Sequence, residues 1–181
     1  MQTPKRKNLR LKNYDYSQNG AYFITICVDS FKCLFGMVEE DRVILSWIGK
    51  IVRDEWLKTF ELRNNLEIDE YVIMPNHFHA IFMINVTDDG CTFDNVGAHR
   101  MRPCNQDSGR MRCAPTIGDV VRGFKATVTS IVNSQSKKKI KLWQRNYYER
   151  IIRDEFELNK IRKYIVENPL KLRLDKYFNI D

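Results

Sequence analysis

Hydrophobic and polar positions along the chain predict a set of short strands. Stretches rich in β-branched and aromatic residues predict strands at 20–28, 66–74 and 77–84. Only a Met-Pro-Asn turn separates the last two, so we expect them to pair as an antiparallel hairpin. Two shorter strands around a Glu-Asp turn are predicted within residues 35–46.

Three further segments carry hydrophobic residues at the three- and four-residue spacing of an α-helix: 46–60, 116–135 and 154–167. Each begins with a serine, threonine or aspartate, whose side chain can cap the first turn. Pro169 is expected to stop the last helix. Strands and helices do not alternate strictly, which disfavours a parallel doubly wound sheet. We predict an α+β fold with helices packed on one face of an antiparallel sheet.

The composition is that of an ordinary globular protein. The chain has 181 residues, of which 43% are hydrophobic, and we expect one domain over residues 1–181. No run approaches the roughly 20 apolar residues of a membrane-spanning helix, and no segment has the form of a signal peptide. The five cysteines form no CxxC pair, which disfavours a zinc knuckle. We expect a cytoplasmic protein that does not bind membranes.

Positive charge changes the picture by suggesting an anionic partner. The net charge is +7, which favours nucleic acid, although a merely soluble basic protein would show the same excess. Residues 1–13 form a basic arm with no acidic residue, suited to lying on a phosphate backbone. Residues 85–115 show no periodicity, so they are expected to form a long loop or insertion with a basic second half.

The clearest candidate for chemistry is a pair of histidines on a predicted strand. His77 and His79 flank Phe78, and alternate residues of a strand point to one face. Two imidazoles on one face can begin a metal site. Two partly exposed strand histidines with no ligand would give the same pattern, and a motif this short often arises by chance.

The last predicted helix offers a second group of candidates. Leu158, Ile161 and Ile165 form a stripe that should face the sheet. Tyr164 and Asn168 lie on the adjoining face, one helical turn apart. Such a helix could hold both side chains beside the histidines, although a half-buried tyrosine is also common without a function.

Five stretches of the chain resemble the REP-associated branch of the single-tyrosine HUH (IS200-like) transposases. They are GAYFITICV, YVIMPNHFHAIF, GDVVRGFKATVT, LWQRNYYERIIR and KYIVENPLK. They occur in the family's order and span nearly the whole chain outside residues 85–115. The specific signals are the HxH pair after Met-Pro-Asn, the Trp-Gln stretch, and a tyrosine separated by three residues from Asn-Pro.

This resemblance implies a ferredoxin-like or RRM-like α+β fold with an HUH endonuclease core. It implies a site-specific endonuclease that cleaves and rejoins single-stranded DNA at REP-like hairpins, through a 5′-phosphotyrosine and with Mg²⁺ or Mn²⁺ as cofactor. Tyr164 matches the nucleophile, and His77, His79 and Asn168 match the metal ligands. Pro169 disfavours helical backbone at the preceding residue, so we expect Asn168 to leave the helical conformation.

Tyr147 and Tyr148 are the alternative nucleophiles. We favour Tyr164 because a nucleophile must be held rigidly against the metal, and we assign the other two to packing or DNA contact. The candidate DNA-binding residues are basic or can stack on bases: Lys5, Arg6, Lys7, Arg10, Lys12, Arg122, Lys125, Trp143, Gln144, Arg145, Tyr148, Lys160 and Lys163.

Two other functions stay open for the same chain. One is a hairpin-binding module without catalytic activity, and the other is a metal-dependent nuclease that hydrolyses DNA without a covalent intermediate. In each case the expected partner is single-stranded hairpin DNA. Either a monomer or a homodimer is compatible with the sequence.

Overall fold

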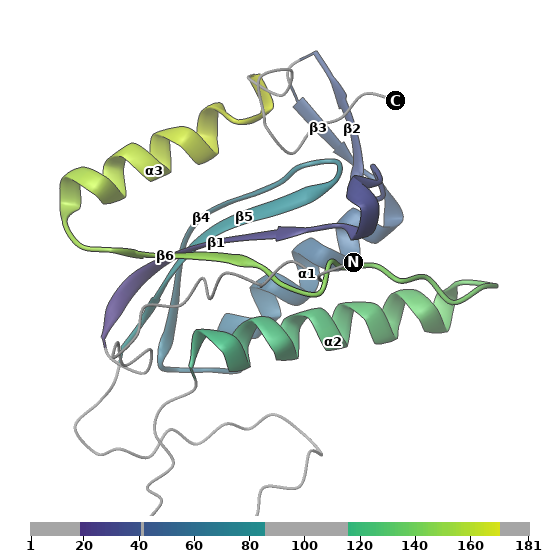
Figure 1. Cartoon of the computed structure of the whole chain (residues 1–181), viewed down its shortest axis with the longest axis horizontal. Coiled ribbons are helices and arrows are strands. Elements are labelled where there is room, and N and C mark those ends of the chain that lie inside the picture. The colour runs from purple at the N-terminus through teal and green to yellow at the C-terminus, as the bar shows by residue number, and fades with distance from the viewer. Residues whose placement is uncertain (1–18, 41, 86–115, 171–181) are drawn as a thin grey trace, which may run out of the picture.

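The computed structural model describes residues 19–40, 42–85 and 116–170 (Figure 1). The predictions for the basic arm and for nearly all of the 85–115 loop therefore lie outside the described residues. In chain order the elements are β1 (Gly20–Cys27), a short 3-10 helix (Asp29–Phe31), β2 (Gly36–Glu39), β3 (Arg42–Leu45), α1 (Trp47–Glu61), β4 (Leu66–Ile73), β5 (His77–Ile84), α2 (Ile117–Gln135), β6 (Tyr148–Ile152) and α3 (Glu155–Glu167).

Four strands form the main sheet in the order β4-β5-β1-β6, and every neighbouring pair is antiparallel. Without the β2–β3 hairpin, the chain order is β1-α1-β4-β5-α2-β6, which is the βαββαβ arrangement of ferredoxin-like folds. The predicted α+β class is confirmed. The β2–β3 hairpin forms a separate two-stranded sheet and comes between β1 and α1 in chain order.

Strand β6 was not predicted. Its five residues, Tyr-Glu-Arg-Ile-Ile, give too short an alternation to stand out beside the basic and aromatic segment before it. In the structure this strand pairs with β1 and forms one edge of the described sheet. The prediction therefore lacked the strand that leads directly into α3.

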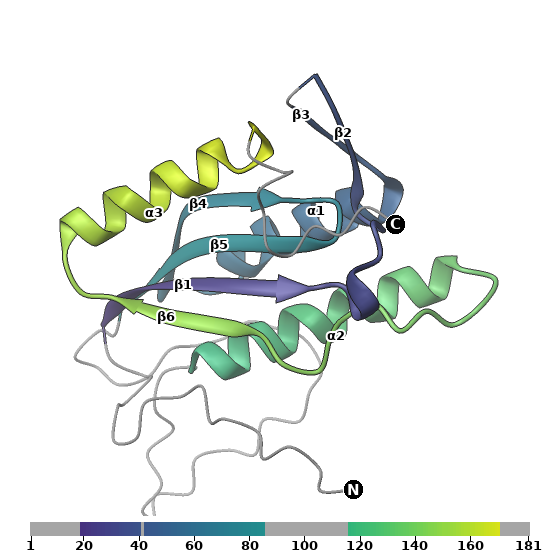
Figure 2. The ribbon, with the colours of Figure 1, turned by 45° about the horizontal axis from the view of Figure 1, so that its top comes forward.

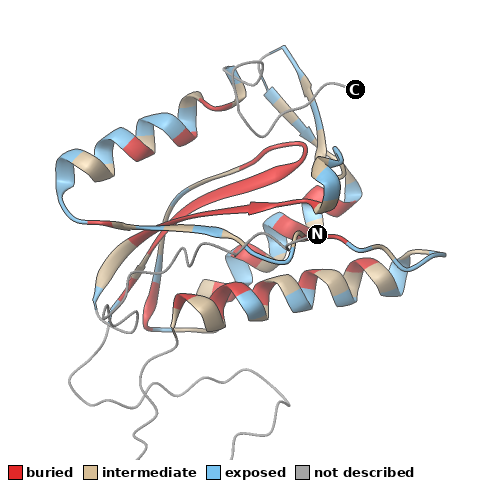
Figure 3. Cartoon of the chain, in the orientation of Figure 1, coloured by how far each residue is buried: buried red, intermediate tan, exposed pale blue. Residues whose placement is uncertain are grey.

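The helices cover both faces of the sheet, and the prediction that they share one face is wrong for α3. Helices α1 and α2 cover one face, and α3 crosses the other (Figures 1 and 2). The reason is that β1 and β5 are buried on both sides, as the red strands of Figure 3 show. A strand that is hydrophobic on both faces requires a cover on each.

The larger core lies between the sheet and the α1–α2 pair. At its centre the ring of Trp56 packs edge-on against Phe78, Phe82 and Phe124, at centroid distances of 5.0, 5.8 and 5.2 Å. The core under α3 is smaller and consists of a few apolar side chains: Phe23, Ile81, Ile152, Ile161 and Ile165. No helix within residues 19–40, 42–85 and 116–170 is both long and apolar enough to cross a membrane.

Candidate active site

The turn before β5 fixes where the histidine pair begins. Backbone hydrogen bonds hold this turn: Val28 N donates to Asn76 O at 2.9 Å, and Met74 N donates to His77 O at 2.8 Å. His77 and His79 are both buried, and both face α3. Phe78, between them, packs into the core on the opposite face. The predicted shared direction of the two imidazoles is confirmed.

Each imidazole has a side-chain partner on its Nδ1 atom. His77 Nδ1 lies 2.7 Å from Asn76 Oδ1. Because an amide oxygen only accepts, Nδ1 of His77 is the donor in this hydrogen bond. His79 Nδ1 lies 2.8 Å from the hydroxyl of Thr25 on the neighbouring strand. The ring centroids are 4.5 Å apart, with the ring planes inclined by 71°.

Tyr164 reaches the histidine pair from α3. Its hydroxyl lies 3.2 Å from His79 Nε2. Phe23 supports both rings, because it stacks on His79 at 5.4 Å and meets Tyr164 edge-on at 6.3 Å. Tyr164 is 41% exposed, so part of the residue is open to solvent although its hydroxyl contacts a buried histidine. Tyr147, one of the alternative nucleophiles, instead packs against the larger core.

A salt bridge ties α3 to the far strand of the sheet. Arg162 Nε donates to both carboxylate oxygens of Asp69 on β4, at 2.9 and 3.1 Å, and Nη2 donates to Oδ2. Asp69 lies where the β4–β5 register shifts, between Ile68 and Tyr71. The hydrogen bonds from Arg162 to Asp69 raise the pKa of the arginine. This pair and the small core under α3 hold the helix over β4 and β5.

Asn168 follows the last residue of α3 and keeps helical backbone angles. Its φ and ψ are −59° and −43°, so the prediction that Pro169 displaces it from the helix is wrong. Its N–H donates to Ile165 O at 3.2 Å. This bond to the third residue back has the 3-10 pattern, and it continues the helical turn up to the proline. The helix starts near the end of β1 that pairs with Ile84 and passes His79 at Tyr164. Asn168 therefore comes one turn further along, on the side of His77.

The side chains predicted to bind the metal are two imidazoles and one amide. Asn168 is buried, and its Oδ1 atom has no hydrogen-bond partner among the residues that the structure describes. A buried acceptor without a donor is costly, and a cation would relieve that cost. In the described parts of the chain no group of three histidine, cysteine, aspartate or glutamate side chains could hold a metal. The family resemblance makes the amide of Asn168 the candidate third ligand beside His77 and His79, and this ligand set stays a prediction.

Several predicted DNA-binding residues lie on the other side of the sheet from Tyr164, around α2. Trp143 is buried against Phe35 and Phe124, at ring-centroid distances of 5.2 and 5.9 Å, which favours packing over base stacking. Lys125 donates to Gln144 O at 2.7 Å, and burial lowers its pKa. These contacts hold the segment before β6 against α2. Arg122 and Arg145 are exposed on the same side.

Other candidates share the face of Tyr164. Lys160 and Lys163 are exposed on α3, and Lys163 lies 3.7 Å from Glu167. Tyr148 is 40% exposed and stands opposite Thr25 in the β1–β6 register. It therefore lies in the same row of the sheet as Thr25 and His79.

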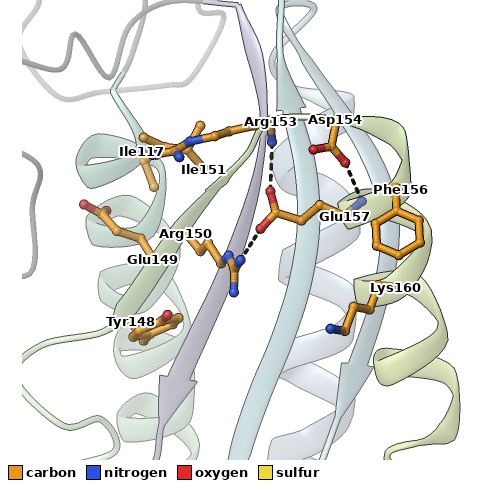
Figure 4. Close-up of a pocket in the computed structure, with 10 residues that line it drawn as sticks. All are labelled: Ile117, Tyr148, Glu149, Arg150, Ile151, Arg153, Asp154, Phe156, Glu157 and Lys160. Atoms are coloured by element: carbon orange, nitrogen blue, oxygen red, sulfur yellow. Dashed lines mark hydrogen bonds and ion pairs between the residues drawn. The ribbon is translucent and has the colours of Figure 1, made fainter.

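Sequence reasoning missed three residues beside Tyr148. Arg150 lies on β6, Arg153 follows that strand, and Phe156 lies in the first turn of α3. All three line a groove between β6 and α3 (Figure 4). The alternation within β6 would have placed Arg150 on the same face as Tyr148 if the strand had been predicted.

Comparison with known proteins relates the chain to one protein by sequence and to another by fold. No protein-family model matches the chain. An uncharacterized protein of Haemophilus influenzae (strain ATCC 51907 / DSM 11121 / KW20 / Rd) is 38% identical over 174 residues, which cover 96% of this chain and 93% of that protein. The structure also resembles the solved structure of a REP-associated tyrosine transposase bound to a REP hairpin, with a TM-score of 0.57 and 19% identity, over 92% of this chain and 76% of that one. The chain therefore belongs to the same family as the Haemophilus influenzae protein, and it has the fold of the REP-associated tyrosine transposase.

Proposed function

We propose that this chain is a tyrosine HUH transposase of the REP-associated type. It would cleave single-stranded DNA at hairpin sites and rejoin it through a 5′-phosphotyrosine. The observation that carries the proposal is the hydroxyl of Tyr164, held 3.2 Å from Nε2 of a buried histidine in an HxH pair. The shared fold with a REP-associated tyrosine transposase supports it, because that protein was solved with a REP hairpin bound.

His77, His79 and Asn168 would hold the divalent cation. When bound, it would polarise the scissile phosphate and stabilise the negative charge of the transition state. Asn76 and Thr25 would orient the two histidines through their Nδ1 atoms, so that each Nε2 faces α3. Three neutral ligands bind a hard cation weakly, so we expect little metal affinity before DNA supplies phosphate oxygens.

Tyr164 would act as the nucleophile. A phenol has a pKa near 10, so only about 0.1% is ionised at neutral pH, and the reaction needs the hydroxyl held in place and the phosphate activated. The phenolic oxygen forms a bond to phosphorus while the bond from phosphorus to the 3′-oxygen breaks. The phenolic proton is lost, and the departing 3′-oxygen takes up a proton to become a 3′-hydroxyl. The phosphotyrosine ester retains the broken bond's energy, so rejoining needs no nucleotide cofactor.

The test is the capture of the covalent intermediate. The full chain is incubated with Mn²⁺ and a single-stranded REP-like hairpin, and the products are separated under denaturing conditions. We expect a protein–DNA adduct that survives denaturation, is lost in Tyr164→Phe and persists in Tyr148→Phe. An adduct that survives Tyr164→Phe and is lost in Tyr148→Phe would refute the assignment of the nucleophile.

The two alternative functions give different products in the same assay. Cleaved ends without an adduct would indicate a hydrolytic nuclease. Hairpin binding without cleavage would indicate a module that has no catalytic activity. Either outcome would overturn the proposed transposase activity.

A further inference from the structure

The hydroxyl of Tyr164 engages the one ring nitrogen through which His79 could bind a cation. The phenolic oxygen lies 3.2 Å from His79 Nε2. The other nitrogen of the ring, Nδ1, lies 2.8 Å from the hydroxyl of Thr25 on β1. Both nitrogens of His79 are thus engaged within the protein, and the partner of Nε2 is the candidate nucleophile itself.

This contact excludes a cation from His79 in either tautomer of the ring. If the proton is on Nδ1, the lone pair of Nε2 accepts the hydroxyl of Tyr164, and a cation needs that same lone pair. If the proton is on Nε2, this nitrogen donates to the phenolic oxygen and has no lone pair for a cation. In both cases the hydrogen bond to Tyr164 must break before His79 can act as a ligand.

The packing of α3 holds the hydroxyl of Tyr164 in this contact. Phe23 stacks on His79 at 5.4 Å and meets Tyr164 edge-on at 6.3 Å. Ile161 and Ile165, which lie near Tyr164 along α3, are buried in the small core under the helix. His79 is 1% exposed, so little water reaches the ring to take the place of the hydroxyl. The fold therefore maintains the bond between Tyr164 and His79.

The third candidate ligand is in the opposite situation. Asn168 is buried, and within the described residues its Oδ1 atom has no hydrogen-bond partner. Its cost as a buried acceptor without a donor is relieved when a cation binds. A cation therefore gains a ligand at Asn168 without breaking a hydrogen bond there, whereas at His79 it must displace Tyr164.

We propose that Tyr164 competes with the divalent cation for Nε2 of His79. The inference rests on the proposed function, because it takes His79 as a metal ligand and Tyr164 as the nucleophile. Breaking the hydrogen bond between the two residues opens the metal site and also lets the phenolic hydroxyl approach a phosphate. Admission of the cation and release of the nucleophile are then the same event. The competition also lowers metal affinity beyond what the three neutral ligands alone would cause.

The test measures the affinity of the full chain for Mn²⁺ in the absence of DNA. Electron paramagnetic resonance of unbound Mn²⁺ gives the Kd for the wild type and for Tyr164→Phe, which keeps the ring and lacks only the hydroxyl. We expect Tyr164→Phe to bind Mn²⁺ about two- to tenfold more tightly, because one neutral hydrogen bond no longer has to be broken. A tyrosine that only supported the fold, or that bound the cation itself, would give an unchanged or weaker affinity in this variant.

Two further comparisons assign the gain to His79. Tyr164→Phe should give no gain in a His79→Ala background, because the nitrogen for which the hydroxyl competes is absent from both proteins. Tyr71→Phe is the matched control, since it removes a phenolic hydroxyl from a ring that packs against Phe78 in the larger core. This control should bind Mn²⁺ like the wild type. Melting temperatures of all the variants report whether each one is folded at the temperature of the titration.

Three outcomes would overturn the competition. They are an equal or weaker Mn²⁺ affinity in Tyr164→Phe, a gain that persists in the His79→Ala background, and no Mn²⁺ binding by either the wild type or Tyr164→Phe. The adduct assay tests the proposed function separately. A wild-type chain that forms no adduct refutes that function, whereas an adduct together with an unchanged Mn²⁺ affinity in Tyr164→Phe refutes the competition alone.

Discussion

The salt bridge between Asp69 and Arg162 leads to an asymmetric prediction for stability. The two residues are 93 positions apart, and the pair joins β4 to the helix that carries Tyr164. The Asp69 side chain is 7% exposed and the Arg162 side chain 37% exposed. The two ends of the bridge therefore lie in different surroundings, and removing one is not equivalent to removing the other.

The structure sets the size of each effect. Removing one partner of a fully buried pair costs about 3–5 kcal/mol, whereas an exposed pair contributes about 0.2–1 kcal/mol. Arg162→Ala leaves a nearly buried carboxylate, so we expect the free energy of unfolding to fall by about 2–3 kcal/mol. Asp69→Ala leaves a guanidinium that reaches water and keeps Asn159 Oδ1 as an acceptor at 3.2 Å. For that variant we expect a loss of about 1 kcal/mol.

A double-mutant cycle measures these values. It compares urea unfolding of the wild type with that of the two single variants and the double variant. The double variant should lose less than the sum of the single losses, since it leaves no unpaired charge behind. Arg53→Ala is the matched control, because Arg53 pairs with Asp54 where both side chains are exposed, and its loss should stay within about 0.5 kcal/mol.

The same variants test whether the bridge positions Tyr164. In Asp69→Ala, adduct formation per folded molecule should slow at saturating hairpin, while the hairpin Kd stays the same. Compared with Arg162→Ala, Arg162→Lys should recover part of the adduct rate, because lysine keeps the charge but loses the two-pronged geometry. Equal stability losses in the two alanine variants, or additive losses in the double variant, would refute the reasoning from burial. An adduct rate that follows only the folded fraction would show that the bridge stabilises without positioning.

Three further predictions concern the metal site and the core. Thr25→Val removes the hydroxyl that contacts His79 Nδ1. The affinity for Mn²⁺, measured by electron paramagnetic resonance in the presence of an uncleavable hairpin, should then fall about tenfold or more. Thr25→Ser is the control because it keeps the hydroxyl, and an unchanged affinity in Thr25→Val would contradict the orienting role. EDTA should abolish adduct formation, and added Mn²⁺ should restore it. In the absence of DNA, EDTA should hardly change the melting temperature of the protein, because three neutral ligands bind the cation weakly. Trp56→Ala should lower the free energy of unfolding by about 3–5 kcal/mol in urea titrations, since this buried ring anchors the core on the face away from Tyr164; a loss below about 1 kcal/mol would mean that this core is not packed as described.

Features that depend on neighbouring residues could be predicted from the sequence. The three helix caps form as expected: Ser46, Thr116 and Asp154 accept hydrogen bonds from the third residue after each, at 3.1, 3.3 and 2.7 Å. The shared direction of His77 and His79 belongs to the same class, because alternation along a strand is a local property. The turn between β4 and β5 was likewise marked by its Met-Pro-Asn sequence.

Features that depend on the packing of distant segments were missed or mistaken. β6 became visible only through its pairing with β1, because five residues carry too little alternation by themselves. The position of α3 followed from strands that are hydrophobic on both faces, a property of the assembled sheet. At Asn168 the preference of a residue before proline was local and correct in general, but the last turn of a packed helix overrode it.

The sequence by itself determined the class of fold, the direction of the histidine pair and, through a family resemblance, the candidacy of Tyr164. Its residues alone left Tyr147 and Tyr148 as alternatives, since nothing local says which tyrosine meets a strand 85 positions earlier. The tertiary structure decided this by packing α3 on the sheet through Ile161 and Ile165, which brings the hydroxyl of Tyr164 to His79. The physical reason is that a contact between distant residues is set by how rigid elements pack, and packing depends on the whole core.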